Sequence, residues 1–215
     1  MCLTRSMSDF RNSPEFEALM VSLSRIEHVN QVAFEAARES ERNVRDHQDR
    51  RRLERENKLL GRQLRSALLC SAYSIAEAVI IGLAPKATEK NEDLKPKVQD
   101  AYDIQDRNPS ALHFRQYQLQ HVLGLCKDKK WDDEWSELHQ LRLMRNMLLH
   151  SGGIEKKTTV SQKVDRGEGF RAWIEPMFEG SEAPIYVLVV GEMHFRQWLQ
   201  TLQKFLLDID AELSK

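Results

Sequence analysis

The fold of this chain is decided by the stretch from Asp132 to Gly153, which reads DDEWSELHQLRLMRNMLLHSGG. Its apolar residues recur with the period of an amphipathic helix, so the stretch predicts a helix from Asp132 to about Ser151. Two glycines follow, and glycine favours the end of a helix. Beyond Gly153 the helical period gives way to short apolar runs. We therefore expect helices before this point and strands directly after it.

The segments before this stretch and at the end of the chain predict further helices. Ser13 as N-cap and Pro14 at the first helical position predict a helix that runs to about residue 38. A second long helix is expected over 53–83, after a solvated helical extension or hinge near 39–52. The remaining expectations are a disordered leader over 1–13, a loop over 86–96, short helices over 97–105 and 110–125, and a final helix over 192–213.

Three short runs after Gly153 predict strands over 158–164, 171–178 and 185–190. Pro176 places the middle run at the edge of a sheet, because proline cannot donate a ladder hydrogen bond. The fold class expected is mainly α. We predict a single domain over 14–213, an up-and-down bundle of four to five helices, with a small β-insert at about 158–190 before the last helix.

The composition excludes several classes of protein. With 30% charged residues and a net charge of -1, the chain is no overall polycation, so an anionic partner must be bound by local patches. The three cysteines Cys2, Cys70 and Cys126 lie far apart, which argues against a disulfide framework or zinc site and favours a reducing cytoplasm. The longest apolar run, within 67–84, contains serines and a glutamate and predicts a buried helix, with no membrane partner.

The helix over 132–151 carries a polar stripe. At about 100° per residue, His139, Arg142, Asn146 and His150 share one face, whereas Arg145 lies inside the apolar arc. An arginine on a core-facing side must be paired or face a pocket, because an unpaired buried charge is costly. Asn146 and His150 are four residues apart and can touch. Arg145 and His150 are about 140° apart, so a loosened helix end or a second subunit is needed to join them.

A partner for Arg145 is predicted from the earlier core helix. Glu77 is the only charged residue between Arg65 and Lys86, and a carboxylate in that apolar setting also needs a partner. Two isolated opposite charges predict a Glu77–Arg145 bridge, with Tyr73 one turn from Glu77. The bridge could lock the register of two helices, and this structural role does not exclude catalysis.

The spacing Arg-x4-His also occurs from Arg42 to His47, where its surroundings differ. This copy sits among acidic residues, without an apolar face and without a terminating glycine. It predicts a solvated helix surface. The placement of Arg145 and His150 in the chain, and not the letters alone, therefore supports a site.

An Arg-polar-x3-His motif that closes a helix, an isolated glutamate in an earlier core helix, and Gly-Gly after the histidine resemble the HEPN superfamily. The resemblance covers about residues 14–213. It implies a metal-independent endoribonuclease without a cofactor, acting as a homodimer in toxin, RNA-decay or phage-defence systems. It implies that His150 transfers protons during attack of the ribose 2′-hydroxyl, that Arg145 stabilises the phosphorane, and that Asn146 orients the site. The products would be a 2′,3′-cyclic phosphate and a 5′-hydroxyl. Some toxin members carry a tyrosine where this chain has Gly152.

A basic stripe on the second long helix offers a surface for RNA. Its members recur at spacings 0, 4, 7, 11 and 14, and are Arg51, Arg55, Lys58, Arg62 and Arg65. Such a row suits phosphate tracking. The alternative, which we favour slightly, is a solvated face paired with Glu54, Glu56 and upstream acids. Trp131 and Trp135 could stack on bases, but core anchors are the favoured interpretation.

Three functions remain open from the sequence. The first is the endoribonuclease, with RNA, a second copy of the chain, and a regulatory or antitoxin protein as partners. The second is a non-catalytic helical module for dimerisation or protein interaction, with Arg145 and Glu77 as a core lock. The third is a nucleotide-binding bundle, which has only the basic stripe behind it because the chain lacks a glycine-rich phosphate loop.

Overall fold

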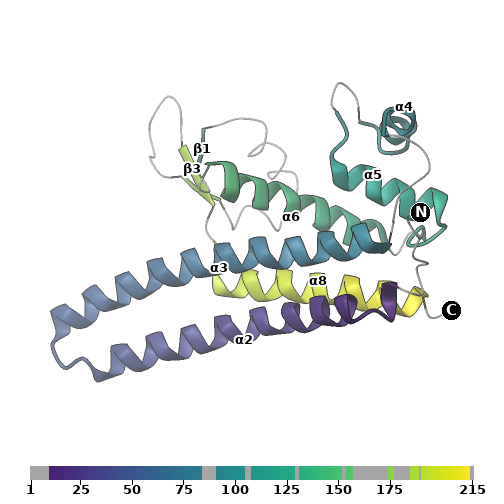
Figure 1. Cartoon of the computed structure of the whole chain (residues 1–215). Helices are drawn as coiled ribbons and strands as arrows, with labels where there is room; N and C mark the ends of the chain where they lie inside the picture. The colour runs from purple at the N-terminus through teal and green to yellow at the C-terminus, as the bar shows by residue number, and fades with distance from the viewer. Residues whose placement is uncertain are drawn as a thin grey trace. The chain divides into compact units, whose positions relative to one another are not determined.

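Long helices make up most of the described chain in the computed structural model, which is mainly α and resembles a helical bundle (Figure 1). The structure describes residues 10–83, 91–104, 108–128, 131–151, 154–156, 174–176, 185–188 and 190–213. The helices are α2 (Pro14–Asn43), α3 (His47–Leu83), α4 (Asn91–Ala101), α5 (Ala111–Tyr117), the π-helical turn η1 (Gln118–Val122), α6 (Asp132–Ser151) and α8 (Glu192–Leu213). The strands are β1 (Ile154–Lys156), β2 (Ile174–Pro176) and β3 (Ile185–Leu188).

The chain divides into two compact units, each described here by itself. The first comprises Met1–Ser22, Ser74–His139 and Thr201–Lys215, and the second comprises Leu23–Tyr73 and Gln140–Gln200. We call them the terminal unit and the motif unit, because the second contains Arg145 and Asn146. The helices α2, α3, α6 and α8 each contribute residues to both.

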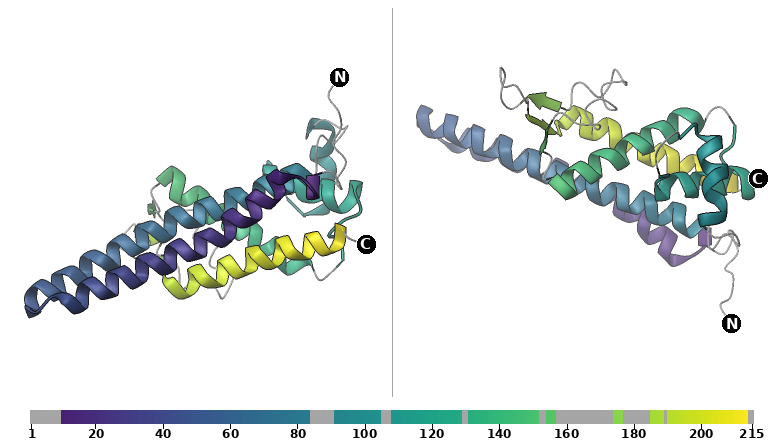
Figure 2. Two further views of the ribbon diagram at one scale, coloured as in Figure 1. Left: turned by 60° about the horizontal axis from the view of Figure 1, so that its bottom comes forward. Right: turned by 90° about the horizontal axis from the view of Figure 1, so that it is seen from above.

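In the motif unit, α2 and α3 form an antiparallel hairpin, which we call the arm (Figures 1 and 2). The amide of Asn57 on α3 donates to the carbonyl oxygen of Ala37 and to the Glu41 carboxylate on α2, at 3.3 and 3.0 Å. Between the helices, Asp46 caps α3, because its side chain accepts from the backbone N–H groups of Gln48 and Asp49. The hinge expected near 39–52 is therefore a short turn at residues 44–46, and the helix is not continuous through it.

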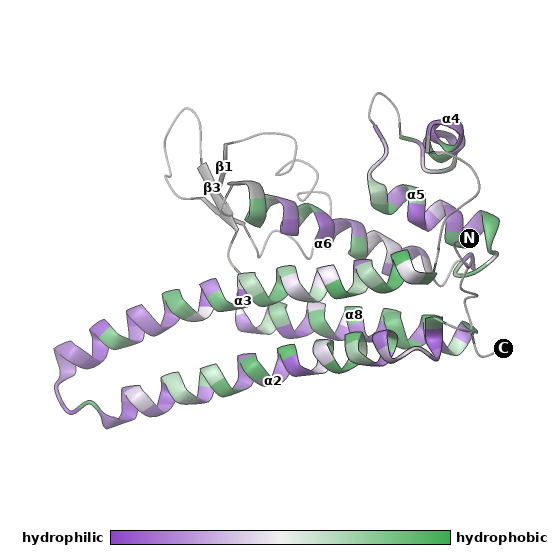
Figure 3. Cartoon of the chain, in the orientation of Figure 1, coloured by the Kyte–Doolittle hydropathy of each residue, from purple (hydrophilic) through white to green (hydrophobic). Residues whose placement is uncertain are grey.

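The first half of α8 packs on the arm in the motif unit. Arg196 donates to the side-chain oxygen of Gln31 on α2 at 2.8 Å, and Arg65 on α3 donates from Nε to the carbonyl oxygen of Val190 at 2.9 Å. The end of the arm at the turn over residues 44–46 is hydrophilic (Figure 3). The core of the motif unit is apolar and includes Leu23, Ile26, Leu69, Ala72, Tyr73, Leu141, Met144, Met147, Phe195, Trp198 and Leu199.

Three short strands form an antiparallel sheet in the order β1-β3-β2. Ile154 pairs with Val187, and Pro176 on the edge strand β2 pairs with Tyr186. The strand expected over 158–164 lies outside the described residues, as does most of the predicted β-insert.

In the terminal unit, two tryptophans at the start of the motif helix belong to the core. Trp131 just before the helix and Trp135 within it are each 1% exposed and meet the ring of Phe205 on α8 edge-on, at centroid distances of 5.6 and 5.1 Å. The indole N–H of Trp135 donates to the carbonyl oxygen of Cys126 at 3.4 Å, and the amide of Gln120 donates to the same oxygen at 2.8 Å. Both tryptophans are core anchors, as the favoured interpretation predicts, and not exposed stacking platforms.

The helix boundaries predicted at the caps are confirmed. α2 begins at Pro14, with the Ser13 hydroxyl accepting from the N–H of Phe16 at 3.2 Å, and α6 and α8 have their predicted bounds. Residues 1–9 of the expected leader lie outside the described residues. Phe10 and Arg11, which the sequence analysis places in that leader, make contacts: the Phe10 ring meets Phe16, and Arg11 pairs with Asp210 at 2.6 Å.

Two predicted segments were wrong in their extent. The loop expected over 86–96 contains the first half of α4, which begins at Asn91 and not at residue 97. Leu94 and Val98, four residues apart, are both fully buried, and this burial outweighs the local signals of lysine and Pro96. The helix expected over 110–125 ends as α-helix at Tyr117 and continues only as η1, because Leu123 N–H donates to the Gln118 carbonyl oxygen at 2.9 Å.

Candidate active site on the motif helix

Arg145 of α6 is directed at α3 and not at solvent. Its guanidinium carbon lies 5.8 Å from the centroid of the Tyr73 ring, in a cation–π arrangement. Its NH1 group donates to the side-chain oxygen of the neighbouring Asn146 at 3.0 Å. Arg145 is half-buried, while Tyr73 is only 1% exposed. The helical wheel predicted this core-facing direction, and it is confirmed.

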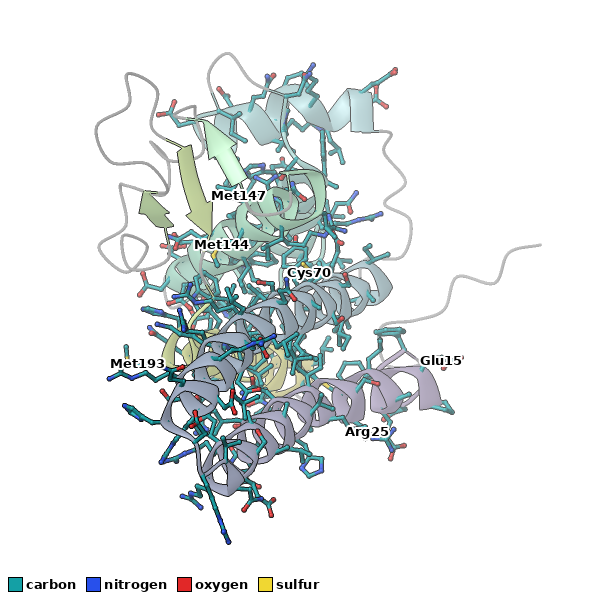
Figure 4. The ribbon with its side chains drawn as sticks, turned by 90° about the vertical axis from the view of Figure 1, so that its left-hand side faces the viewer. Glu15, Arg25, Cys70, Met144, Met147 and Met193 are labelled. Carbon is teal, nitrogen blue, oxygen red and sulfur yellow. The ribbon has the colours of Figure 1, made fainter. Side chains whose placement is uncertain are left out.

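Two buried methionines lie close to Arg145 in the sequence of α6, and the Cys70 thiol of α3 lies near its charge. Met144 and Met147, on the same helix, are 1% and 5% exposed. Figure 4 shows them with Cys70, which lies on α3 one turn before Tyr73. In an apolar setting the positive charge of Arg145 acts over a longer distance than in water, because little solvent screens it. The Tyr73 ring and the Asn146 side chain therefore hold the guanidinium of Arg145 in one position on α6.

The positive charge of Arg145 affects the pKa of the Cys70 thiol. Burial raises the pKa of Cys70 above its usual range, and the positive charge of Arg145 acts in the opposite direction because it favours the thiolate. Cys70 therefore keeps its proton at neutral pH, which does not suit a nucleophile. Sequence reasoning gave Cys70 no role at this position.

We expect Arg145→Gln to raise the pKa of Cys70 further, because the change removes a nearby positive charge from an already half-buried thiol. The measurement is the pH midpoint of Cys70 alkylation, followed by mass spectrometry of the peptide that contains it. Arg145→Lys is the matched control, since it keeps the charge. A midpoint that stays the same or falls in Arg145→Gln would show that Arg145 does not act on this thiol.

The structure brings together two of the three predicted catalytic residues. Arg145 and Asn146 share a hydrogen bond, whereas His150 lies in α6 and its side chain is outside the described residues. The contact predicted between Asn146 and His150 stays a prediction. Glu77 belongs to the terminal unit and Arg145 to the motif unit, so the Glu77–Arg145 bridge also stays a prediction.

The structure gives Tyr73 a different role from the one expected from the sequence. The sequence places it one turn from Glu77, whereas its ring contacts Arg145 directly. The sequence contains no signal for this contact, because the period of one helix does not show which residue of the neighbouring helix lies opposite.

The basic stripe divides into an outer and an inner part. Arg51, Arg55 and Lys58, the outer stripe, are exposed, whereas Arg62 and Arg65 are half-buried. Arg65 is engaged through its bond to the Val190 carbonyl oxygen, and burial lowers its pKa from the ordinary value. The inner end of the stripe therefore helps to hold α8 on α3.

The acidic residues proposed to neutralise the stripe have other partners. Glu54 pairs with Arg50 at 3.5 Å and Glu56 with Arg52 at 2.8 Å, each one turn apart on α3. Within the described part of the chain, no carboxylate forms an ion pair with Arg51, Arg55 or Lys58. The outer stripe is thus a row of cations whose charge is not cancelled by Glu54 or Glu56.

The second copy of the Arg-x4-His spacing lies at the turn of the arm. Arg42 lies in the last turn of α2, His47 begins α3, and both side chains are exposed. The two residues therefore fall on different helices and face solvent, as the sequence predicted for a surface without function. This copy provides a control for experiments on Arg145 and His150.

Comparison of the chain with protein-family models, curated proteins and solved structures found no match. Among the residues that the structure describes, no group of three or more His, Cys, Asp or Glu side chains is placed to hold a metal ion. By length and composition alone, α3 contains one stretch apolar enough to cross a membrane. Several of the apolar residues of α3 are buried inside the protein itself, namely Leu69, Ala72, Tyr73, Ala76, Val79, Ile80 and Leu83.

Proposed function

We propose that this chain is a metal-independent endoribonuclease of the HEPN type. The observation that carries the proposal is the state of Arg145, which is held over Tyr73, hydrogen-bonded to Asn146, and followed by His150 near the end of the same helix. A fixed guanidinium in a poorly solvated setting is the group that stabilises an oxyanion best, because it needs no reorganisation as charge develops.

In the proposed reaction, His150 takes the proton from the ribose 2′-hydroxyl as its oxygen attacks the adjacent phosphorus. Arg145 stabilises the extra negative charge on the phosphorane, and Asn146 holds the guanidinium through its side-chain oxygen. The bond from phosphorus to the 5′-oxygen then breaks, and the protonated histidine returns its proton to that oxygen, which leaves as a hydroxyl and restores neutral His150. The products are a 2′,3′-cyclic phosphate and a 5′-hydroxyl, so the proton account closes without an oxidant or cofactor.

The proposal includes a homodimer. Arg145 and His150 are about 140° apart around an ideal helix, so one α6 presents them in different directions. A second copy of the chain would supply the missing group on the opposite side of the phosphate, which makes dimerisation part of the mechanism. A regulatory or antitoxin protein and a cytoplasmic location complete the proposed setting.

The proposal is tested by incubating the purified chain with mixed single-stranded RNA in excess EDTA. Fragments that end in a 2′,3′-cyclic phosphate and begin with a 5′-hydroxyl are expected, since no metal takes part. The ends are identified by their response to polynucleotide kinase, which can phosphorylate a 5′-hydroxyl. Cleavage that stops when EDTA is added would overturn the metal-independent mechanism, and products with a 5′-phosphate would overturn attack by the 2′-hydroxyl.

A non-catalytic helical module is the second candidate, and the contacts of Arg145 favour it. A guanidinium occupied by Tyr73 and Asn146 could serve only to lock α6 on α3. In that case Arg145→Ala lowers the melting temperature, and no preparation of the wild-type chain cleaves RNA. A nucleotide-binding bundle would instead be stabilised against melting by added nucleotide.

A further inference from the structure

The basic stripe and Tyr73 lie on one face of α3. Tyr73 follows Arg55 by 18 residues, and Leu69 follows Arg51 by the same number. Eighteen residues make five turns at about 3.6 residues per turn, so the two members of each pair point in the same direction. Leu69 and Tyr73 are buried, and Tyr73 carries Arg145. The face that α6 covers at Tyr73 is therefore the face that carries the outer stripe nearer the start of α3.

The motif helix ends where this face becomes exposed. In the motif unit, α6 runs in the direction opposite to α3, so its Ser151 end is turned toward the start of α3 (Figures 1 and 2). With Arg145 over Tyr73, the residues that follow Arg145 lie progressively closer to the inner stripe. Arg51, Arg55 and Lys58 lie beyond that point and are exposed. Between the end of α6 and these exposed cations lie the half-buried Arg62 and Arg65, of which Arg65 donates to the Val190 carbonyl oxygen.

The row is regularly spaced along α3. Its members are alternately four and three residues apart, which is about 4.5 to 6 Å along the helix. The row carries no aromatic side chain, so it offers attraction to a backbone but no stacking surface for bases. The exposed residues between Arg50 and Lys58 are all polar, so this part of the arm lacks the broad apolar face of an interfacial membrane helix, and the row favours a polyanion.

We infer that the outer stripe of the arm is a track that holds one unpaired RNA strand by its phosphates before the strand reaches the proposed site on α6. This inference rests on the proposed function for its end point. A straight row suits an unpaired strand, which can extend along it, better than a duplex, whose backbones wind away. The exposed part of the row runs from Arg51 to Lys58 and is about 10 Å long along the helix.

The first test measures binding with His150→Ala, which keeps the RNA uncut if the proposed function holds. Binding of a fluorescent unpaired RNA of about 12 nucleotides is measured over a range of salt concentrations. Arg51→Gln/Arg55→Gln is expected to reduce the slope of log affinity against log salt by about 0.7 for each arginine removed. The matched control, Arg50→Gln/Arg52→Gln, removes equal charge from neighbouring positions that pair with acids, and its slope is expected to stay that of the parent.

The outcomes separate the track from the nuclease. One outcome is that the wild-type chain does not cleave RNA, while Arg51→Gln/Arg55→Gln (the stripe variant) loses salt-dependent binding and the control variant keeps it. The track then stands as an RNA-binding surface, and the proposed nuclease is wrong. If the wild type cleaves RNA and both double variants share one slope, the nuclease stands and the track is overturned. The track would also be overturned if Arg51→Gln/Arg55→Gln lost binding to anionic phospholipid vesicles while its binding to RNA stayed unchanged.

Substrate length gives an independent readout of the same inference. The wild-type chain is expected to cleave an RNA of about 12 nucleotides with a higher kcat/KM per bond than a tetranucleotide, because only the longer RNA spans the row and the site. The stripe variant is expected to lose most of this preference, and Arg50→Gln/Arg52→Gln to keep it. Equal kcat/KM per bond for both lengths in the wild type would contradict a track.

Discussion

His150→Ala is expected to lower the rate of RNA cleavage about 10²- to 10⁴-fold, the usual cost of removing a general acid–base group. The physical reason is that the 2′-hydroxyl is a poor nucleophile until its proton is taken as it attacks. The measurement is the initial rate of cleavage of one defined RNA in EDTA. The melting temperature is measured on the same sample, so that loss of activity is not confused with loss of fold.

The chain supplies its own control for this experiment. His47 follows Arg42 with the same spacing, but both are exposed at the turn of the arm. His47→Ala is expected to cleave RNA as fast as the wild type. If His150→Ala also cleaves at the wild-type rate, His150 does not transfer the proton and the assignment of the site is wrong.

Trp135→Ala is expected to lower the free energy of unfolding by about 3 to 5 kcal/mol, the range measured for removing a large aromatic side chain from a core. Trp135 is 1% exposed, and its ring lies 5.1 Å from that of Phe205. Removing the indole N–H also leaves the Cys126 carbonyl oxygen with one donor fewer. The measurement is denaturation by urea, with the slope m compared between variants to check that unfolding stays cooperative.

A matched change on α8 tests whether burial is the cause. Leu207 is 59% exposed, and Leu207→Ala is expected to alter the free energy of unfolding by no more than about 0.5 kcal/mol. The two interpretations of Trp135 give opposite results. A variant of Trp135 that keeps its stability but loses RNA affinity would identify a stacking platform instead of a core anchor.

The parts of the fold that the sequence could predict are those fixed by local chemistry. Ser13 and Pro14 define the start of α2, and the glycines after Ser151 agree with the end of α6, because capping depends on a few adjacent residues. The start of α4 was missed because lysines and Pro96 dominate its composition. Its helical state depends on the burial of Leu94 and Val98, which requires the rest of the protein.

The site shows the same division between local and tertiary information. The direction of Arg145 follows from the period of α6 alone, and it was predicted correctly. The ring that Arg145 meets was not, because the wheel of one helix cannot say which residue of α3 lies opposite. The π-helical turn after Tyr117 has the same cause, since a bond from residue i to i+5 leaves no mark in composition.

The arm has a consequence for how the chain can change in evolution or in the laboratory. It is an antiparallel pair whose two helices are joined at residues 44–46, so it can be shortened from its tip without touching Tyr73, Arg145 or Asn146. Removing about seven residues from each helix takes away about two turns at the tip and leaves the buried Ile26 and the Gln31–Arg196 contact in place. If the outer stripe binds RNA as inferred, the length of the arm would set how many of its cations contact the strand, independently of Arg145 and Asn146.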